Sequence, residues 1–115
     1  MNIRDKVLEY ITHSSYVSYV ELQRIVGEEQ GAGSQAHSFE DFNIDLWWGM
    51  SKELAVAIES LQKDHLIHSH ASNPLVYAID GGLPKMAIAK SMRKYKKPRW
   101  LPVVFQPGES CDTCS

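Results

Sequence analysis

The fold is decided by residues 51–80, SKELAVAIESLQKDHLIHSHASNPLVYAID. A serine, favoured as a helix N-cap, opens the stretch, and apolar residues then recur at helical spacing over residues 52–63. Residues 65–70 are expected to form a strand, Pro74 to lie in a turn, and residues 75–79 to form the returning strand. The stretch therefore predicts a helix followed by a β-hairpin. The expected core stripe of the helix consists of Leu54, Ala55, Ile58 and Leu61.

Two further helices are expected on the N-terminal side of this stretch. Residues 2–13 carry an apolar stripe at three- and four-residue spacing, and residues 19–26 follow Ser18, whose hydroxyl is suited to cap a helix. Residues 28–41 are polar, contain glycine and show no periodicity, so a mobile loop is expected there. Residues 42–47 alternate between apolar and polar types, which favours a short strand.

The C-terminal side begins with a predicted helix that is rich in lysine and arginine. Residues 84–95 have helical periodicity, and Pro98 ends the pattern. Residues 100–105 are apolar and β-branched, and they are expected to pack on the body as an edge strand because Pro102 lacks a ladder donor. Residues 106–115 predict a disordered tail.

Length and composition favour one domain over residues 1–105. The chain has 115 residues, of which 43% are hydrophobic and 23% charged, so most of it is expected to fold. The N-terminus has no signal-peptide pattern and no apolar run is long enough to span a membrane, so a cytoplasmic protein without membrane contact is expected. Residues 1–80 hold five Lys/Arg against twelve Asp/Glu, a net charge of −7, whereas the remainder nets +5. This asymmetry is a compositional sign of a partner.

The order of elements resembles that of a winged helix-turn-helix domain. The resemblance is carried by VLEYITHSSYVSYVELQRIV (residues 7–26), ELAVAIESLQKDHLIHSH (residues 53–70) and NPLVYAID (residues 73–80). It implies an α+β fold with a three-helix core and a small antiparallel sheet with a wing hairpin, followed here by the additional helix and tail. It also implies a small DNA-binding protein, such as a transcription regulator, in which the third helix enters the major groove and the wing contacts the backbone.

Basic residues that could contact phosphates gather in residues 85–99. Tyr95 among them and Trp100 directly after them could stack on bases. The alternatives are a solvated face or a cationic patch that docks on the acidic part of the same domain. The third helix would supply any base readout. The predicted nucleic-acid-binding residues are Lys90, Arg93, Lys94, Lys96, Lys97, Arg99, Lys52 and Lys63.

The second hypothesis is a protein-interaction module, either homodimeric or a subunit of a complex, which uses the same scaffold without reading DNA. Its predicted partner-binding residues are Trp47, Trp48 and Trp100. Because Trp47 and Trp48 are adjacent, a strand would turn them to opposite faces, with one in the core and the other available as an anchor.

No enzymatic motif is found, so no catalytic residue, cofactor or small-molecule ligand is predicted. Cys111 and Cys114 have the spacing of half a zinc site, and His68 and His70 could supply the two other ligands from one strand face. A single CxxC near a chain end is more often an unligated tail, and the sequence interpretation therefore assigns no metal site.

Overall fold

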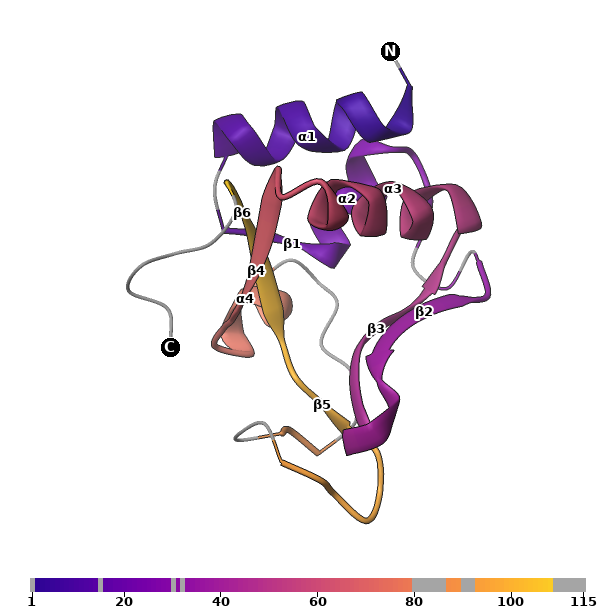
Figure 1. Ribbon diagram of the computed structural model, residues 1–115, viewed down its shortest axis with the longest axis vertical. Coiled ribbons are helices and arrows are strands. Elements are labelled where there is room, and N and C mark those ends of the chain that lie inside the picture. Colours follow the sequence, from indigo (N-terminus) through magenta and orange to yellow (C-terminus); the bar gives the residue numbers. More distant parts are fainter. Residues whose placement is uncertain are drawn as a thin grey trace.

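Apolar residues at helical spacing bring the first and third helices together over a shared core. The computed structural model of the protein describes residues 2–14, 16–29, 31, 33–79, 87–89 and 93–108. Helix α1 (Ile3–Ser14) packs against helix α3 (Lys52–Lys63), and the short helix α2 (Tyr19–Ile25) lies between them in sequence (Figure 1). The three helices predicted at residues 2–13, 19–26 and 52–63 are therefore confirmed.

Serine hydroxyls begin two of these helices, as the sequence predicts. Ser18 Oγ accepts a hydrogen bond from the Glu21 amide at 3.1 Å, and Ser51 Oγ accepts one from the Leu54 amide at 3.2 Å. Each bond satisfies an amide that has no partner within its own helix. The start of α3 is thereby fixed at the residue where the sequence places it.

One antiparallel sheet has the strand order β1-β6-β4. It joins β1 (Val17–Ser18), β6 (Val103–Pro107) and β4 (Ile67–Ala71), and Phe105 lies opposite both Val17 and Ser69. The prediction of an edge strand over residues 100–105 is wrong, because β6 is the central strand. Pro102 precedes β6, so the missing proline donor does not interrupt the ladder.

The predicted returning strand at residues 75–79 is instead the short helix α4 (Leu75–Ile79). Asn73 Oδ1 accepts a bond from the Leu75 amide at 2.9 Å, and the Pro74 carbonyl accepts one from the Tyr77 amide at 3.0 Å. Asparagine and proline directly before the helix together favour a helix start, because the asparagine side chain caps an amide and proline has a fixed φ. The hairpin prediction is therefore wrong, and β4 pairs with β6.

A second sheet has the strand order β2-β3-β5. Strands β2 (Gln35–Phe39) and β3 (Ile44–Met50) form an antiparallel hairpin around the 3-10 turn η1 (Glu40–Phe42), and β5 (Arg99–Trp100) pairs parallel to β3. The expected mobile loop at 28–41 thus contains a strand. A Cβ at Gly33 would lie 1.9 Å from the Met50 carbonyl oxygen, so this close approach requires glycine.

The basic helix predicted over residues 84–95 is absent from its described part. Residues 87–89 are extended, and Ile88 forms a parallel bridge with Trp100. Residues 93–95 are likewise not helical. Backbone bonds to Trp100 explain the extended conformation, because the Ala89 amide donates to the Trp100 carbonyl at 2.8 Å and Trp100 donates in turn to Ala87. The rest of that prediction lies outside the described residues.

The segment that contains β5 and β6 runs from one sheet to the other (Figure 1). Aromatic residues of both sheets belong to one hydrophobic core. Within it Tyr77 contacts Trp47 and Trp100, with ring centroids 5.1 and 5.0 Å apart, and Tyr19 contacts Phe105 at 5.0 Å. Strand β6 continues to Pro107, so the predicted tail is wrong for its first residues, and residues 109–115 lie outside the described part. In the described part no helix is long and apolar enough to cross a membrane.

Candidate nucleic-acid interface

The basic loop, defined here as residues 93–99, is held at the far end of the β2–β3 hairpin (Figure 1). The Tyr95 amide donates to the Phe42 carbonyl at 3.0 Å, and Asn43 Nδ2 donates to the Tyr95 carbonyl at 2.8 Å. The Arg99 amide donates to the Asn43 carbonyl at 2.9 Å. These three hydrogen bonds, two between backbone groups and one from a side-chain amide, fix the loop, so its charged side chains project from a defined position.

Most of the predicted phosphate contacts in this loop face solvent. Arg99 is half-buried, and the exposed residues are Arg93, Lys94, Lys96 and Lys97. The Arg93 and Arg99 guanidinium carbons lie 5.0 and 4.8 Å from the centre of the Tyr95 ring, a distance typical of cation–π contact. Tyr95 and Trp100 are buried, so the prediction that these two aromatic rings stack on bases is wrong. Lys90 lies outside the described residues.

No carboxylate of the described residues lies within 4.0 Å of a charged group of the basic loop. Among the described residues, Arg4 pairs with Asp64, and Glu59 lies beside the imidazole of His37; neither contact involves the basic loop. The patch is therefore not neutralised by ion pairs with the described acidic part of the chain. Cations that are not paired within their own chain are the groups that attract a polyanion.

Helix α3 offers much less positive charge than the basic loop. Lys52 and Lys63 are both exposed but stand at opposite ends of the helix, about 16 Å apart at the helical rise. The helix N-terminus is already occupied by Glu28, whose carboxylate accepts bonds from the Ser51 amide at 2.9 Å and the Ser51 hydroxyl at 2.8 Å. This carboxylate fills the position at which a helix start binds phosphate.

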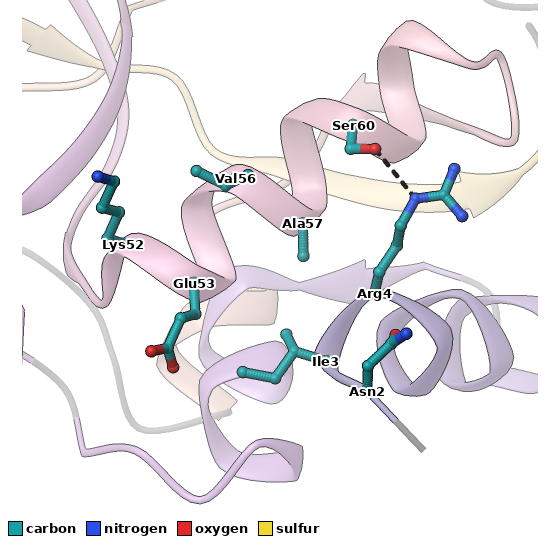
Figure 2. A pocket seen from close by; sticks show the side chains of 8 residues that line it. All are labelled: Asn2, Ile3, Arg4, Lys52, Glu53, Val56, Ala57 and Ser60. Carbon is teal, nitrogen blue, oxygen red and sulfur yellow. Dashed lines mark hydrogen bonds between the residues drawn. The ribbon is translucent and has the colours of Figure 1, made fainter.

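An apolar groove lies between the start of α1 and the outer face of α3 (Figure 2). Ile3, Val56 and Ala57 line it, and its volume is about 430 Å³. Arg4 closes one end, because its Nε donates to Ser60 Oγ at 3.0 Å and its Nη2 pairs with Asp64 at 2.6 Å. The groove gives the outer face of α3 an apolar character.

The predicted partner-binding tryptophans divide between core and surface. Trp47 is buried and its Nε1 donates to Gln23 Oε1 at 3.0 Å, while Trp100 is buried and its Nε1 donates to the Leu46 carbonyl at 3.1 Å. Both are core residues, so their predicted role as surface anchors is wrong for this chain. Trp48 is 37% exposed and contacts Trp47 at 5.4 Å between ring centroids, which leaves it available as an anchor.

A polar chain that sequence reasoning missed runs from the buried Tyr19 and His37 to the exposed Glu59. His37 Nδ1 lies 3.0 Å from the Tyr19 hydroxyl, and Nε2 lies 3.2 Å from both the Ala55 carbonyl oxygen and Glu59 Oε1. Since both groups at Nε2 only accept, neutral His37 carries its proton there and Nδ1 accepts from Tyr19. Burial lowers the pKa of His37, although Glu59 and the Ala55 carbonyl act in the opposite direction.

This polar chain does not present a nucleophile. Burial, followed by the influence of Tyr77 and Glu59, raises the pKa of Tyr19 well above its ordinary value. The phenol therefore stays protonated, and almost none of it faces solvent. Its role is to satisfy polar groups between α2, β2 and α3. No local pattern signals it, because His37 lies in the polar stretch 28–41, for which the sequence predicts a mobile loop.

A second histidine cluster lies on β4, where Nε2 of His68 and Nε2 of His70 are 2.7 Å apart. Among the described residues no group of three His, Cys, Asp or Glu side chains is placed to hold a metal ion. Cys111 and Cys114 lie outside those residues.

Comparison of the chain with protein-family models, with curated proteins and with solved structures finds no match, so its function has to be inferred from these surfaces.

Proposed function

We propose that the chain is a small winged-helix DNA-binding protein, acting as a transcription regulator, whose basic loop contacts the phosphate backbone. The order α1, β1, α2, α3, β4, β6 supports this proposal, as does the antiparallel sheet β1-β6-β4 that accompanies the helices. Relative to that plan, the β2–β3 hairpin is an insertion between α2 and α3. A second insertion, which includes α4 and the basic loop, separates β4 from β6.

The observation that carries the proposal is the uncompensated charge of the basic loop. Four exposed cationic side chains and a half-buried arginine lie within seven residues, and the described part of the chain brings no carboxylate into ion-pair distance of them. Duplex DNA releases condensed counterions when such groups neutralise its phosphates, and this release drives sequence-independent affinity. The anchored backbone also limits the ordering cost of binding.

The experiment is a salt titration of binding to a mixed-sequence duplex, followed by fluorescence anisotropy. Lys96→Gln and Lys97→Gln should each reduce the slope of log affinity against log salt by about 0.9 if the residue contacts one phosphate. Lys6→Gln removes the same charge from the exposed face of α1 and is the matched control, with no slope change expected. Lys52→Gln/Lys63→Gln reports whether α3 also contacts the duplex.

Absence of binding at low salt would reject the proposal. Equal slope changes for Lys6→Gln and the loop variants would also reject it, because net charge and not a defined contact would then govern the affinity.

The second candidate is a protein-interaction module that uses the outer face of α3. The specific observation in its favour is the apolar groove, in which Val56 is 51% exposed next to Ile3 and Ala57. Light scattering on the pure chain tests the homodimeric form. A dimer that Val56→Asp dissociates, while Val56→Ala does not, would support this candidate; a monomer at all concentrations would reject that form.

A further inference from the structure

A cavity of about 340 Å³, named here the β2–α3 cavity, lies between strand β2, the second half of α3 and strand β4. Ligand pockets usually have volumes of about 300–1,000 Å³, so this one has room for a small ligand or for one long side chain. Its lining consists of residues 36–40, of Glu59 and Gln62 on α3, of Ser69 on β4, and of the buried residues Tyr19 and Leu46.

The lining of the β2–α3 cavity is anionic. Its carboxylates belong to Glu40 and Glu59, and none of its lining residues is a lysine or arginine. His37 adds no positive charge at neutral pH, because burial lowers its pKa. No lysine or arginine of the described residues lies within ion-pair distance of either carboxylate. The cavity therefore favours a cation over an anion.

The Glu59 carboxylate contacts the cavity lining and not its neighbour on α3. Lys63 follows Glu59 by four residues, a spacing at which helical ion pairs form, yet no ion pair links these two described residues. Glu59 Oε1 instead lies 3.2 Å from His37 Nε2, and the Glu59 side chain is 62% exposed. A carboxylate has about four acceptor positions, so Glu59 can accept further hydrogen bonds from a ligand while it keeps its contact with His37.

The rest of the lining suits a flat cation that is carried on an apolar stem. The Phe39 ring is 40% exposed, and Leu46 and Tyr19 supply buried apolar surface. The face of an aromatic ring binds a guanidinium by stacking and cation–π contact. The side-chain oxygens of Ser38 and Gln62 can accept hydrogen bonds from its N–H groups.

Among cations, a guanidinium fits this lining better than an ammonium or a metal ion. An ammonium is compact and strongly hydrated. A guanidinium is weakly hydrated, stacks on aromatic faces and pairs with a carboxylate through two parallel N–H bonds. A metal ion needs several close ligands, and no group of three His, Cys, Asp or Glu side chains in the described part of the chain is placed to hold one.

We propose that the β2–α3 cavity binds an alkylguanidinium group, carried either by a small molecule or by an arginine side chain of a polypeptide. Glu59 accepts the paired N–H bonds, the Phe39 ring stacks on the guanidinium plane, and Leu46 contacts the aliphatic stem. Glu40 adds a second negative charge. The site goes beyond the proposed DNA contact and shares no residue with the basic loop, so each can fail without the other.

The test is a titration of the full ¹⁵N-labelled chain with butylguanidinium, followed by amide chemical shifts. The amides of Ser38, Gln62 and Ser69 should shift, with a Kd in the millimolar range or tighter. Butylurea has nearly the same shape without the charge and should bind at least about fivefold more weakly. Butylammonium should also bind more weakly, because it cannot form two parallel bonds to one carboxylate.

Glu59→Gln should weaken binding by at least about fivefold, because a hydrogen bond to an ionised acceptor is stronger than one to a neutral acceptor. Glutamine keeps an oxygen that can accept from His37. Glu53→Gln removes the same charge from an exposed position at the apolar groove of α3 and is the matched control. Ser69→Phe fills the cavity from an exposed position and should abolish binding. Circular dichroism verifies that each variant keeps the fold.

Equal affinities for butylguanidinium and butylurea would overturn the proposal, and so would an affinity that Glu59→Gln leaves unchanged. Equal binding of butylammonium would overturn the choice of guanidinium. Shifts that spare residues 36–40 and Gln62 would place the ligand elsewhere and reject the site. A blocked Gly-Arg-Gly peptide distinguishes the two sources. Binding at least as tight as that of butylguanidinium would assign the site to an arginine side chain, whereas exclusion of the peptide alone would assign it to a free small molecule.

Discussion

Removal of the Tyr77 hydroxyl should destabilise the fold severely, because this group joins three elements. Tyr77 Oη donates to the Val103 carbonyl at 2.6 Å and accepts a bond from the Tyr19 amide at 3.2 Å. All three residues are buried, so water cannot replace the hydroxyl without opening the core. Tyr77→Phe keeps the ring contacts but leaves one buried acceptor and one buried donor without this partner, each at about 1–3 kcal/mol.

The expected loss in the free energy of unfolding is about 2–4 kcal/mol, a large share of the 5–15 kcal/mol typical of a domain. Equilibrium urea unfolding, monitored by tryptophan fluorescence, measures it. Tyr16→Phe is the matched control, because Tyr16 is 65% exposed and its loss should change stability by no more than about 0.5 kcal/mol. A cost below about 1 kcal/mol for Tyr77→Phe would refute the docking of α4 between α2 and β6.

Two further stability measurements probe the polar contacts. The lowered pKa values of His37 and His70 mean that the unfolded chain takes up protons first as the pH falls. The stability that the two histidines contribute by staying neutral is therefore present above about pH 6.5 and is lost as the pH falls below it. The free energy of unfolding should fall between pH 7 and 5, and His37→Gln should make this fall shallower, whereas His13→Gln should leave it unchanged. Glu28→Ala should cost about 1–2 kcal/mol in urea unfolding by removing the carboxylate at the start of α3; an equal loss in Glu29→Ala, which alters an exposed neighbour, would contradict that assignment.

The parts of the fold that could be predicted from sequence are those governed by local chemistry. Helix α3 begins at the residue that follows the Ser51 cap, and its apolar spacing correctly identifies Leu54, Ile58 and Leu61 as core. Cap geometry and helical periodicity depend on residues a few positions apart. They therefore appear in the sequence itself.

The errors arise where distant backbone partners override a local pattern. Residues 87–89 have helical periodicity but pair with Trp100, and residues 35–39 lack alternation but pair with β3. The wrong prediction of a strand after Pro74 has a local cause, because asparagine followed by proline suits a turn and a helix start equally. Residues 75–79 form a helix, and this helix buries Tyr77 in the core. Strand pairing over such separations cannot be derived from short windows of sequence.

The candidate sites were predictable only as far as composition allows. The charge of the basic loop is evident from the sequence, and its exposure follows from the structure. That Trp100 is core, and that the Nε2 atoms of His68 and His70 meet, depend on packing and rotamers. Alternation along a strand indicates a shared face for the two histidines. It cannot specify a distance of 2.7 Å between two nitrogens.

The arrangement of insertions separates the proposed binding surface from the groups that stabilise the fold. Hydrogen bonds to Phe42 and Asn43 attach the backbone of the basic loop to the end of the β2–β3 hairpin. The lysine side chains of the loop are exposed. Lys96 and Lys97 form no ion pair within the described residues, so their replacement should change stability by no more than about 0.5 kcal/mol. A loss of DNA affinity in Lys96→Gln or Lys97→Gln, with unfolding unchanged, would therefore report a lost contact and not a damaged fold. Helix α3 does not keep binding and stability apart in this way. Its N-terminus, where a phosphate could approach, is the end that Glu28 already caps.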